Sequence, residues 1–214
     1  MRIHALTFIL LLLSLTALTQ KTFSGGIIGG PVLSQISGDG LGGWDKLGFA
    51  AGAWVNVPFN EKFSLDISMR YITKGSRTKR DTLSFNTFGY YLNYVDVPLL
   101  LRIEFPKAST KKLKYSAYVG PYAGVLLKQK IRFNGADLDI NPPFNNYDFG
   151  VQFGASVWLG PKFFVQYLIS TSALPTRPNP SITNKNSYYE KGNYNQVMHL
   201  LFGLRFGGGS SVEP

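Results

Sequence analysis

Long runs in which apolar and polar residues alternate one by one constrain this chain more than any other feature. Residues 63–73 are the clearest case, with Phe63 beginning the apolar face and Ser64 the polar one. Residues 95–105 and 147–159 repeat the pattern. Strict alternation predicts β-strands with one apolar and one polar face, because successive side chains along a strand point to opposite sides.

Counting these runs predicts eight strands, and most of them are long. Strands of soluble sheets usually have about five or six residues, whereas a tilted strand that crosses a bilayer needs about 9–11. The expected strands therefore have the length of membrane-spanning strands. They span residues 22–34, 47–58, 62–73, 91–105, 113–130, 146–160, 162–174 and 195–206.

The connections between these strands fall into two classes. Tight turns are expected at 58–61 and 160–161 and a modest turn at 106–112, whereas the other four connections are longer and rich in Gly, Asn, Ser, Thr and Pro. An even strand count with short turns at one end and long loops at the other is typical of an outer-membrane barrel. The predicted fold is all-β: an eight-stranded antiparallel up-and-down transmembrane β-barrel with a filled polar lumen. The long connections are 35–46, 74–90, 131–145 and 175–194.

The apolar faces are predicted to point outward, because they carry large side chains that the narrow interior of an eight-stranded barrel could not hold. The polar faces carry glycines and charges of both signs, which suits a packed network better than a solvated exterior. An arginine facing lipid would also cost about 2–4 kcal/mol at the midplane of the bilayer. The predicted lumen network consists of Asp66, Arg70, Asp96, Arg102, Glu104, Asp148, Gln152, His199 and Arg205.

The N-terminus has the features of a secretory signal. Arg2 precedes an apolar stretch over residues 5–18, and cleavage is expected close to Gln20. We therefore expect a signal peptide at 1–19, a barrel domain at 20–206 and a flexible tail at 207–214, with export to the cell outer membrane. Export excludes nucleic acid as a partner in spite of the net charge of +10.

Six short motifs follow one another along the chain, at residues 23–26, 46–52, 71–75, 94–100, 119–122 and 148–150. In this order they resemble the PorT family of outer-membrane β-barrel proteins from Bacteroidetes-type bacteria. This resemblance implies an eight-stranded barrel with both termini in the periplasm, and some members resemble accessory factors of a secretion system. The expected role is a structural or interaction protein, accessory to protein secretion or envelope integrity, with an envelope or secretion-complex partner.

No motif indicates a cofactor, a metal site or an enzyme. The chain has no cysteine, and the glycine-rich residues 25–30 lack the helix that a phosphate-binding loop must open. One alternative is a barrel enzyme that modifies lipid A with His199 as general acid or base, near Ser170, Ser156 or Asp148. A lumen histidine held by hydrogen bonds is the stronger interpretation, because no spacing motif supports catalysis. A second alternative is a secreted lipocalin-like carrier, on the basis of the G-x-W pattern at 42–44.

The densest basic segment lies in the expected loop 74–90. Lys74, Arg77, Lys79 and Arg80 are predicted to face the lipopolysaccharide of the outer leaflet, through charge-assisted hydrogen bonds to its phosphate groups. Outer-membrane lipid and lipopolysaccharide are therefore the expected partners.

Overall fold

The computed structural model describes residues 23–41, 43–78, 87–105, 113–139, 142–178 and 192–206. The expected signal peptide and C-terminal tail lie outside these residues, as do Lys79 and Arg80. No helix among the described residues is long and apolar enough to cross a membrane.

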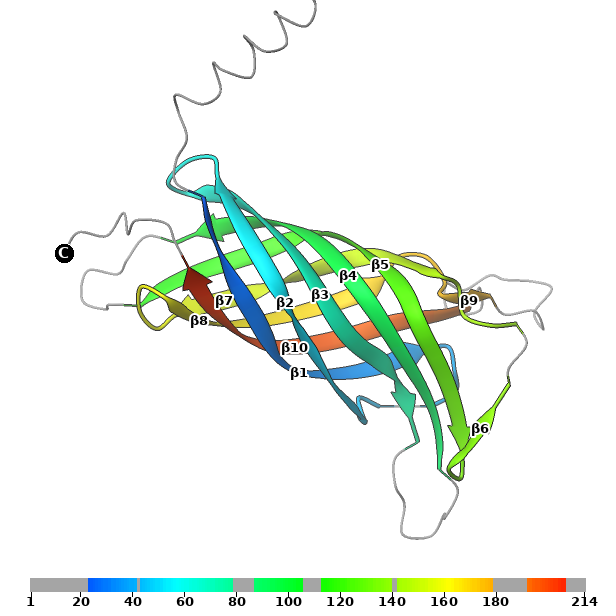
Figure 1. Cartoon of the computed structure of the whole chain (residues 1–214). Helices are drawn as coiled ribbons and strands as arrows, with labels where there is room; N and C mark the ends of the chain where they lie inside the picture. Colours follow the sequence, from blue (N-terminus) through cyan, green and yellow to red (C-terminus); the bar gives the residue numbers. More distant parts are fainter. Residues whose placement is uncertain are drawn as a thin grey trace, which may run out of the picture.

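Eight long antiparallel strands form a closed ring, because the first strand also pairs with the last (Figure 1). The predicted eight-stranded barrel is therefore confirmed. Two short strands lie outside the ring: β6 (Ala136–Leu138) pairs with β5, and β9 (Arg177–Pro178) pairs with β10. The ring consists of β1 (Ser24–Ser37), β2 (Lys46–Pro58), β3 (Phe63–Arg77), β4 (Phe88–Glu104), β5 (Lys114–Phe133), β7 (Tyr147–Trp158), β8 (Phe163–Ser172) and β10 (Gly192–Phe206).

The two ends of the barrel differ in their connections. The start of β1 and the end of β10 lie at the same end as the turns that join β2 to β3 and β7 to β8 (Figure 1). We call this the short-turn end. The short strands β6 and β9 lie at the opposite, long-loop end.

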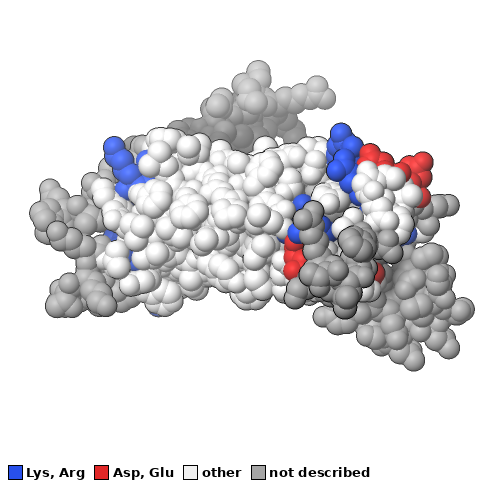
Figure 2. Space-filling view, turned by 90° about the horizontal axis from the view of Figure 1, so that it is seen from below, with Lys and Arg blue, Asp and Glu red and all other residues white. Residues whose placement is uncertain are grey.

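The wall of the barrel is apolar on its outside. Figure 2 shows an uncharged band across the middle of the molecule, with charged residues at the two ends. Leu99 and Phe153 are 42% and 48% exposed, whereas Arg70 and Arg102 are only 2% and 5% exposed. The prediction that bulky side chains face outward and arginines face inward is confirmed.

Aromatic side chains pair on the outer surface near both margins of this band. Phe163 and Phe202 stack near the short-turn end, and Tyr147 stacks on Phe149 toward the long-loop end. Paired aromatics at both margins match the girdles that flank the lipid-facing band of membrane barrels.

A β-bulge in β5 changes the direction of its side chains. Leu126 pairs with Tyr94 and Lys128 pairs with Asn93, so Leu127 is an extra residue without a partner across β4. Even-numbered residues of β5 point inward before the bulge, as buried Tyr122 shows, whereas odd-numbered Ile131 is buried after it. One extra residue therefore exchanges the two faces of the strand.

Candidate functional site

A buried ion-pair cluster fills the middle of the lumen. The Lys74 Nζ lies 2.9 Å from Asp96 Oδ2 and 2.9 Å from Asp148 Oδ2. The rings of Tyr94 and Tyr122 each lie with their centres 4.7 Å from the same nitrogen. Lys74 is fully buried, so two carboxylates and two aromatic faces replace its hydration shell.

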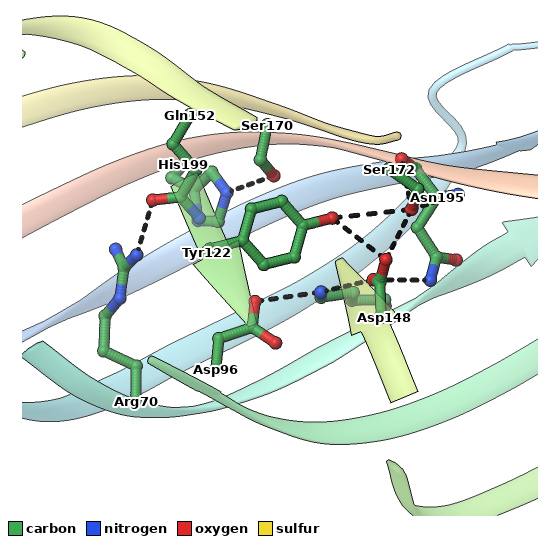
Figure 3. A network of polar contacts seen from close by, with 10 residues as sticks. Arg70, Asp96, Tyr122, Asp148, Gln152, Ser170, Ser172, Asn195 and His199 are labelled. Carbon is green, nitrogen blue, oxygen red and sulfur yellow. Dashed lines mark hydrogen bonds and ion pairs between the residues drawn. The ribbon is translucent and has the colours of Figure 1, made fainter. Parts of the chain in front are cut away.

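Asp148 on β7 connects several strands through hydrogen bonds (Figure 3). Its carboxylate accepts from Ser172 Oγ at 2.7 Å, from Asn195 Nδ2 at 3.0 Å and from Tyr122 Oη at 3.2 Å. These donors come from β8, β10 and β5. The Lys74 ammonium from β3 is a fourth partner. The Asp148 carboxylate therefore links β7 to four other strands inside the lumen.

Two further polar pairs extend this cluster toward the short-turn end. Arg70 Nη2 donates to Gln152 Oε1 at 2.7 Å, and Arg70 sits opposite Asp96 in the pairing of β3 with β4. Ser170 Oγ lies 3.0 Å from His199 Nε2. Arg70 and Lys74 thus bring two basic side chains to the two carboxyl groups of Asp96 and Asp148.

A second ion-pair group lies near the short-turn end. Arg102 Nη2 is 2.8 Å from Glu104 Oε1, and Arg102 Nη1 is 3.8 Å from Asp66 Oδ1. Asn56 Nδ2 donates to Asp66 and also, at 2.7 Å, to Ser64 Oγ. This group is more open than the central cluster, because the Glu104 side chain is 33% exposed.

Aromatic rings fill the lumen beside this second group. The Trp54 and Trp158 rings pack against Phe164 with centroids 5.4 Å and 4.6 Å away. The Arg102 and Arg205 guanidinium carbons lie 5.0 Å and 5.1 Å from the centre of the Trp158 ring. The lumen is thus filled by an aromatic cluster as well as by polar groups, which the alternation pattern did not reveal.

Glycine at position 203 makes room for this packing. A Cβ atom at Gly203 would overlap the Phe164 ring, which the two tryptophans already hold on other sides. A cavity of about 10 Å³ remains between the aromatic cluster and Arg70. That volume is about the space of one water molecule.

The long-loop end of the lumen is covered by an aromatic cap. Phe144 is 3% exposed and packs edge to face on Tyr90, with centroids 5.5 Å apart. Arg177 Nε donates to the Pro142 carbonyl at 2.9 Å, and its guanidinium lies 5.7 Å from the centre of the Phe144 ring. Chain segments that follow β5 and β8 therefore close the barrel above the central cluster.

The structure places the nine predicted lumen residues inside the barrel, but in two groups. Asp66, Arg102, Glu104 and Arg205 gather near the short-turn end, and the remaining five belong to the central cluster. Sequence reasoning missed Tyr94, Tyr122, Ser172 and Asn195. Tyr94 lies in step with Asp96 on β4 and Asn195 with His199 on β10, so strand alternation was the available signal for these two. Tyr122 and Ser172 lie on β5 and β8, where no lumen residue was predicted.

Lys74 was predicted on a loop facing lipopolysaccharide, and the structure corrects this. β3 continues to Arg77 rather than ending at residue 73. Lys74 therefore remains in step with inward-facing Arg70 and Ile72 and enters the lumen. Arg77, three residues further on, is exposed at the strand end.

The hydroxyl and imidazole groups near His199 are enclosed by the barrel wall. His199 and Ser170 are 0% and 1% exposed, so a lipid substrate outside the wall would not reach them. Among the described residues, no three His, Asp or Glu side chains gather in a way that could hold a metal ion.

The family model for the outer membrane protein beta-barrel domain matches residues 19–174. The chain belongs to this family. It is therefore an outer-membrane β-barrel protein, and the soluble lipocalin-like alternative is wrong. In outer-membrane barrels in general, the short turns face the periplasm and the long loops face outward.

The barrel is also similar to solved outer-membrane proteins. One is Ail of Yersinia pestis, in complex with the heparin analogue sucrose octasulfate, at 15% identity and a TM-score of 0.45, covering 86% of this chain and 99% of that one. OprG of Pseudomonas aeruginosa has 12% identity and a TM-score of 0.46, covering 87% and 96%. The N-terminal barrel domain of Pseudomonas aeruginosa OprF has 11% identity and a TM-score of 0.40, covering 87% and 98%. No curated protein sequence matches the chain.

Proposed function

We propose that this protein is a structural and interaction component of the outer membrane rather than a pore or an enzyme. The observation that carries the proposal is the packed lumen, in which side chains of all eight strands meet. The central ion-pair cluster, the aromatic cluster and the Phe144 cap follow one another along the axis. An eight-stranded barrel filled in this way has no room for a solute.

The proposed role is accessory to protein secretion or envelope integrity, with the long loops presented outward to a partner in the envelope or in a secretion complex. The resemblance to PorT-family barrels of Bacteroidetes-type bacteria supports this assignment. A signal peptide over residues 1–19 would supply the export route. The buried position of His199 argues against the lipid-A-modifying alternative, since its partner Ser170 is also inside.

A combined experiment tests the closed barrel. The purified protein is folded into lipid vesicles, and its gel mobility is compared before and after boiling. We expect a folded form that resists detergent unheated and shifts after boiling, together with no steady conductance in planar bilayers. Recovery from the soluble periplasmic fraction without a boiling shift, or a stable ion conductance, would contradict the proposal.

A further inference from the structure

Exposed basic side chains at the long-loop end gather on one side of the outer surface. The described members are Arg77 on β3 and Lys128, Lys130 and Arg132 on β5, of which Lys130 is half-buried and the others are exposed, and we call them the basic ribbon. Arg177, which follows β8 on another side, instead turns inward to the Phe144 cap. Within the part of the chain that the structure describes, these four outward-facing cations therefore lie together on β3 and β5.

The bulge at Leu127 is the reason that this sector is basic. Before it, even-numbered residues of β5 point into the lumen, so an unbroken strand would turn Lys128, Lys130 and Arg132 inward. After it, these residues pair with Asn93, Tyr91 and Gly89 on the outer face of β4. The extra residue therefore keeps three cations out of the lumen and aligns them along one strand.

Neighbouring groups contact two of these cations, Lys130 and Arg132. The Arg132 guanidinium lies 5.7 Å from the centre of the Tyr91 ring. Lys130 Nζ and Arg132 Nε contact the two carboxylate oxygens of Asp137 at 3.1 Å and 2.9 Å. Hydrogen bonds from both cations hold the pKa of Asp137 below its usual value, so it is ionised at neutral pH. Such exposed pairs are weak, so a more highly charged anion can compete with Asp137 for both cations.

Apolar surface lies directly below the basic ribbon. Leu127 is 58% exposed and Val125 is 46% exposed on the same strand, just inside the uncharged band. This order, cations above and bulky apolar side chains below, is complementary to an amphiphile with phosphate groups above acyl chains. The ribbon lies at the long-loop end, and the amphiphile of the outer leaflet that has this chemistry is lipopolysaccharide.

We propose that the basic ribbon is a binding site for the phosphorylated lipid A portion of lipopolysaccharide. Lys128, Lys130 and Arg132 would bind its phosphate groups, and Leu127 and Val125 would contact its acyl chains. The proposal rests on the proposed function, because it needs the long-loop end to face the outer leaflet. It replaces Lys74 with residues of β5 as the contact to lipid.

The test compares two triple variants of the folded protein in detergent. K128Q/K130Q/R132Q removes three charges from the ribbon, and K62Q/K114Q/K162Q removes three from the short-turn end. With purified lipopolysaccharide as the probe, we expect the ribbon variant to bind on the order of 100-fold more weakly, because each basic side chain near an anionic membrane surface contributes about 1 kcal/mol. The control variant should bind as tightly as the unmodified protein.

Two further probes identify the ligand. Chemically dephosphorylated lipopolysaccharide should bind the unmodified protein as weakly as intact lipopolysaccharide binds the ribbon variant. Equal loss in both triple variants, unchanged binding by the ribbon variant, or equal competition by phosphatidylglycerol dissolved in the same detergent would overturn the inference. The boiling shift is measured on every sample. A protein that shifts on boiling but does not bind lipopolysaccharide contradicts only this inference, whereas a protein that never shifts contradicts the proposed function.

Discussion

Two lysines of this barrel form ion pairs of nearly equal length in very different surroundings. Lys74 lies 2.9 Å from a carboxylate oxygen in the lumen, and Lys130 lies 3.1 Å from one on the basic ribbon. The side chain of Lys74 is 0% exposed, whereas that of Lys130 is 38% exposed. The same separation gives a much stronger Coulomb interaction where water is excluded.

This contrast shows that the two pairs serve different purposes. In the lumen, each charge depends on its partners, because an unpaired buried charge is very costly. The cluster thus links its strands into one unit. On the ribbon, solvent screens the pair with Asp137, so Lys130 and Arg132 can exchange that carboxylate for another anion.

Removing the buried lysine should have the largest effect on stability. Lys74→Met keeps most of the side-chain volume but leaves Asp96 and Asp148 without their shared cation. We expect the free energy of unfolding to fall by about 3–5 kcal/mol, since breaking a buried ion pair strands the remaining charge. Urea unfolding in lipid vesicles, followed by tryptophan fluorescence, measures this change.

A second substitution separates the effect of the stranded charge on stability from the effect of altered packing. Lys74→Met with Asp96→Asn removes one stranded carboxylate, and Asp148 keeps its hydrogen bonds from Ser172, Asn195 and Tyr122. The double variant should therefore recover part of the lost stability. A double variant less stable than Lys74→Met alone would contradict the electrostatic explanation.

A substitution in the aromatic part of the lumen tests packing there without altering any charge. Gly203→Ala places a methyl group against Phe164, which Trp54 and Trp158 confine. Overpacking of this kind costs about 1–3 kcal/mol, so we expect a smaller loss than for Lys74→Met. Gly160→Ala, in a turn where an added Cβ meets nothing within 4 Å, is the matched control. Equal unfolding midpoints for the two variants would show that Phe164 is free to move.

The barrel itself could be predicted from the sequence because its wall follows a single rule. Apart from the bulge in β5, side chains alternate between lipid-facing and lumen-facing positions along the strands. The apolar side chain of Leu99 and the charge of Arg102 are enough to assign each residue to its face. The outer end of β3 was predictable in principle. Lys74 follows Arg70 and Ile72 at a spacing of two residues, so its side chain is expected on the same inward face. Its place in the densest basic segment, directly after the expected end of the strand at residue 73, instead favoured a loop.

The bulge was not predictable in the same way. Leu126 and Leu127 are adjacent and equally apolar, so the sequence does not mark which one is the extra residue. The partners of Asp148 were also hidden. Tyr122, Ser172 and Asn195 come from three strands, and only the closure of the ring brings them to one carboxylate.

The smallest effect on stability is expected for the same substitution at the exposed lysine. Lys130→Met removes a cation from the ribbon but leaves Asp137 in water and still paired with Arg132 at 2.9 Å. Solvent-exposed pairs contribute little to folding, so the urea midpoint should stay close to that of the unmodified protein while Lys74→Met shifts it strongly. Both variants carry the same change of side chain and lose the same charge. A Lys130→Met midpoint as low as that of Lys74→Met would mean that burial does not separate the two pairs, and the ribbon would then have to be regarded as part of the structural core.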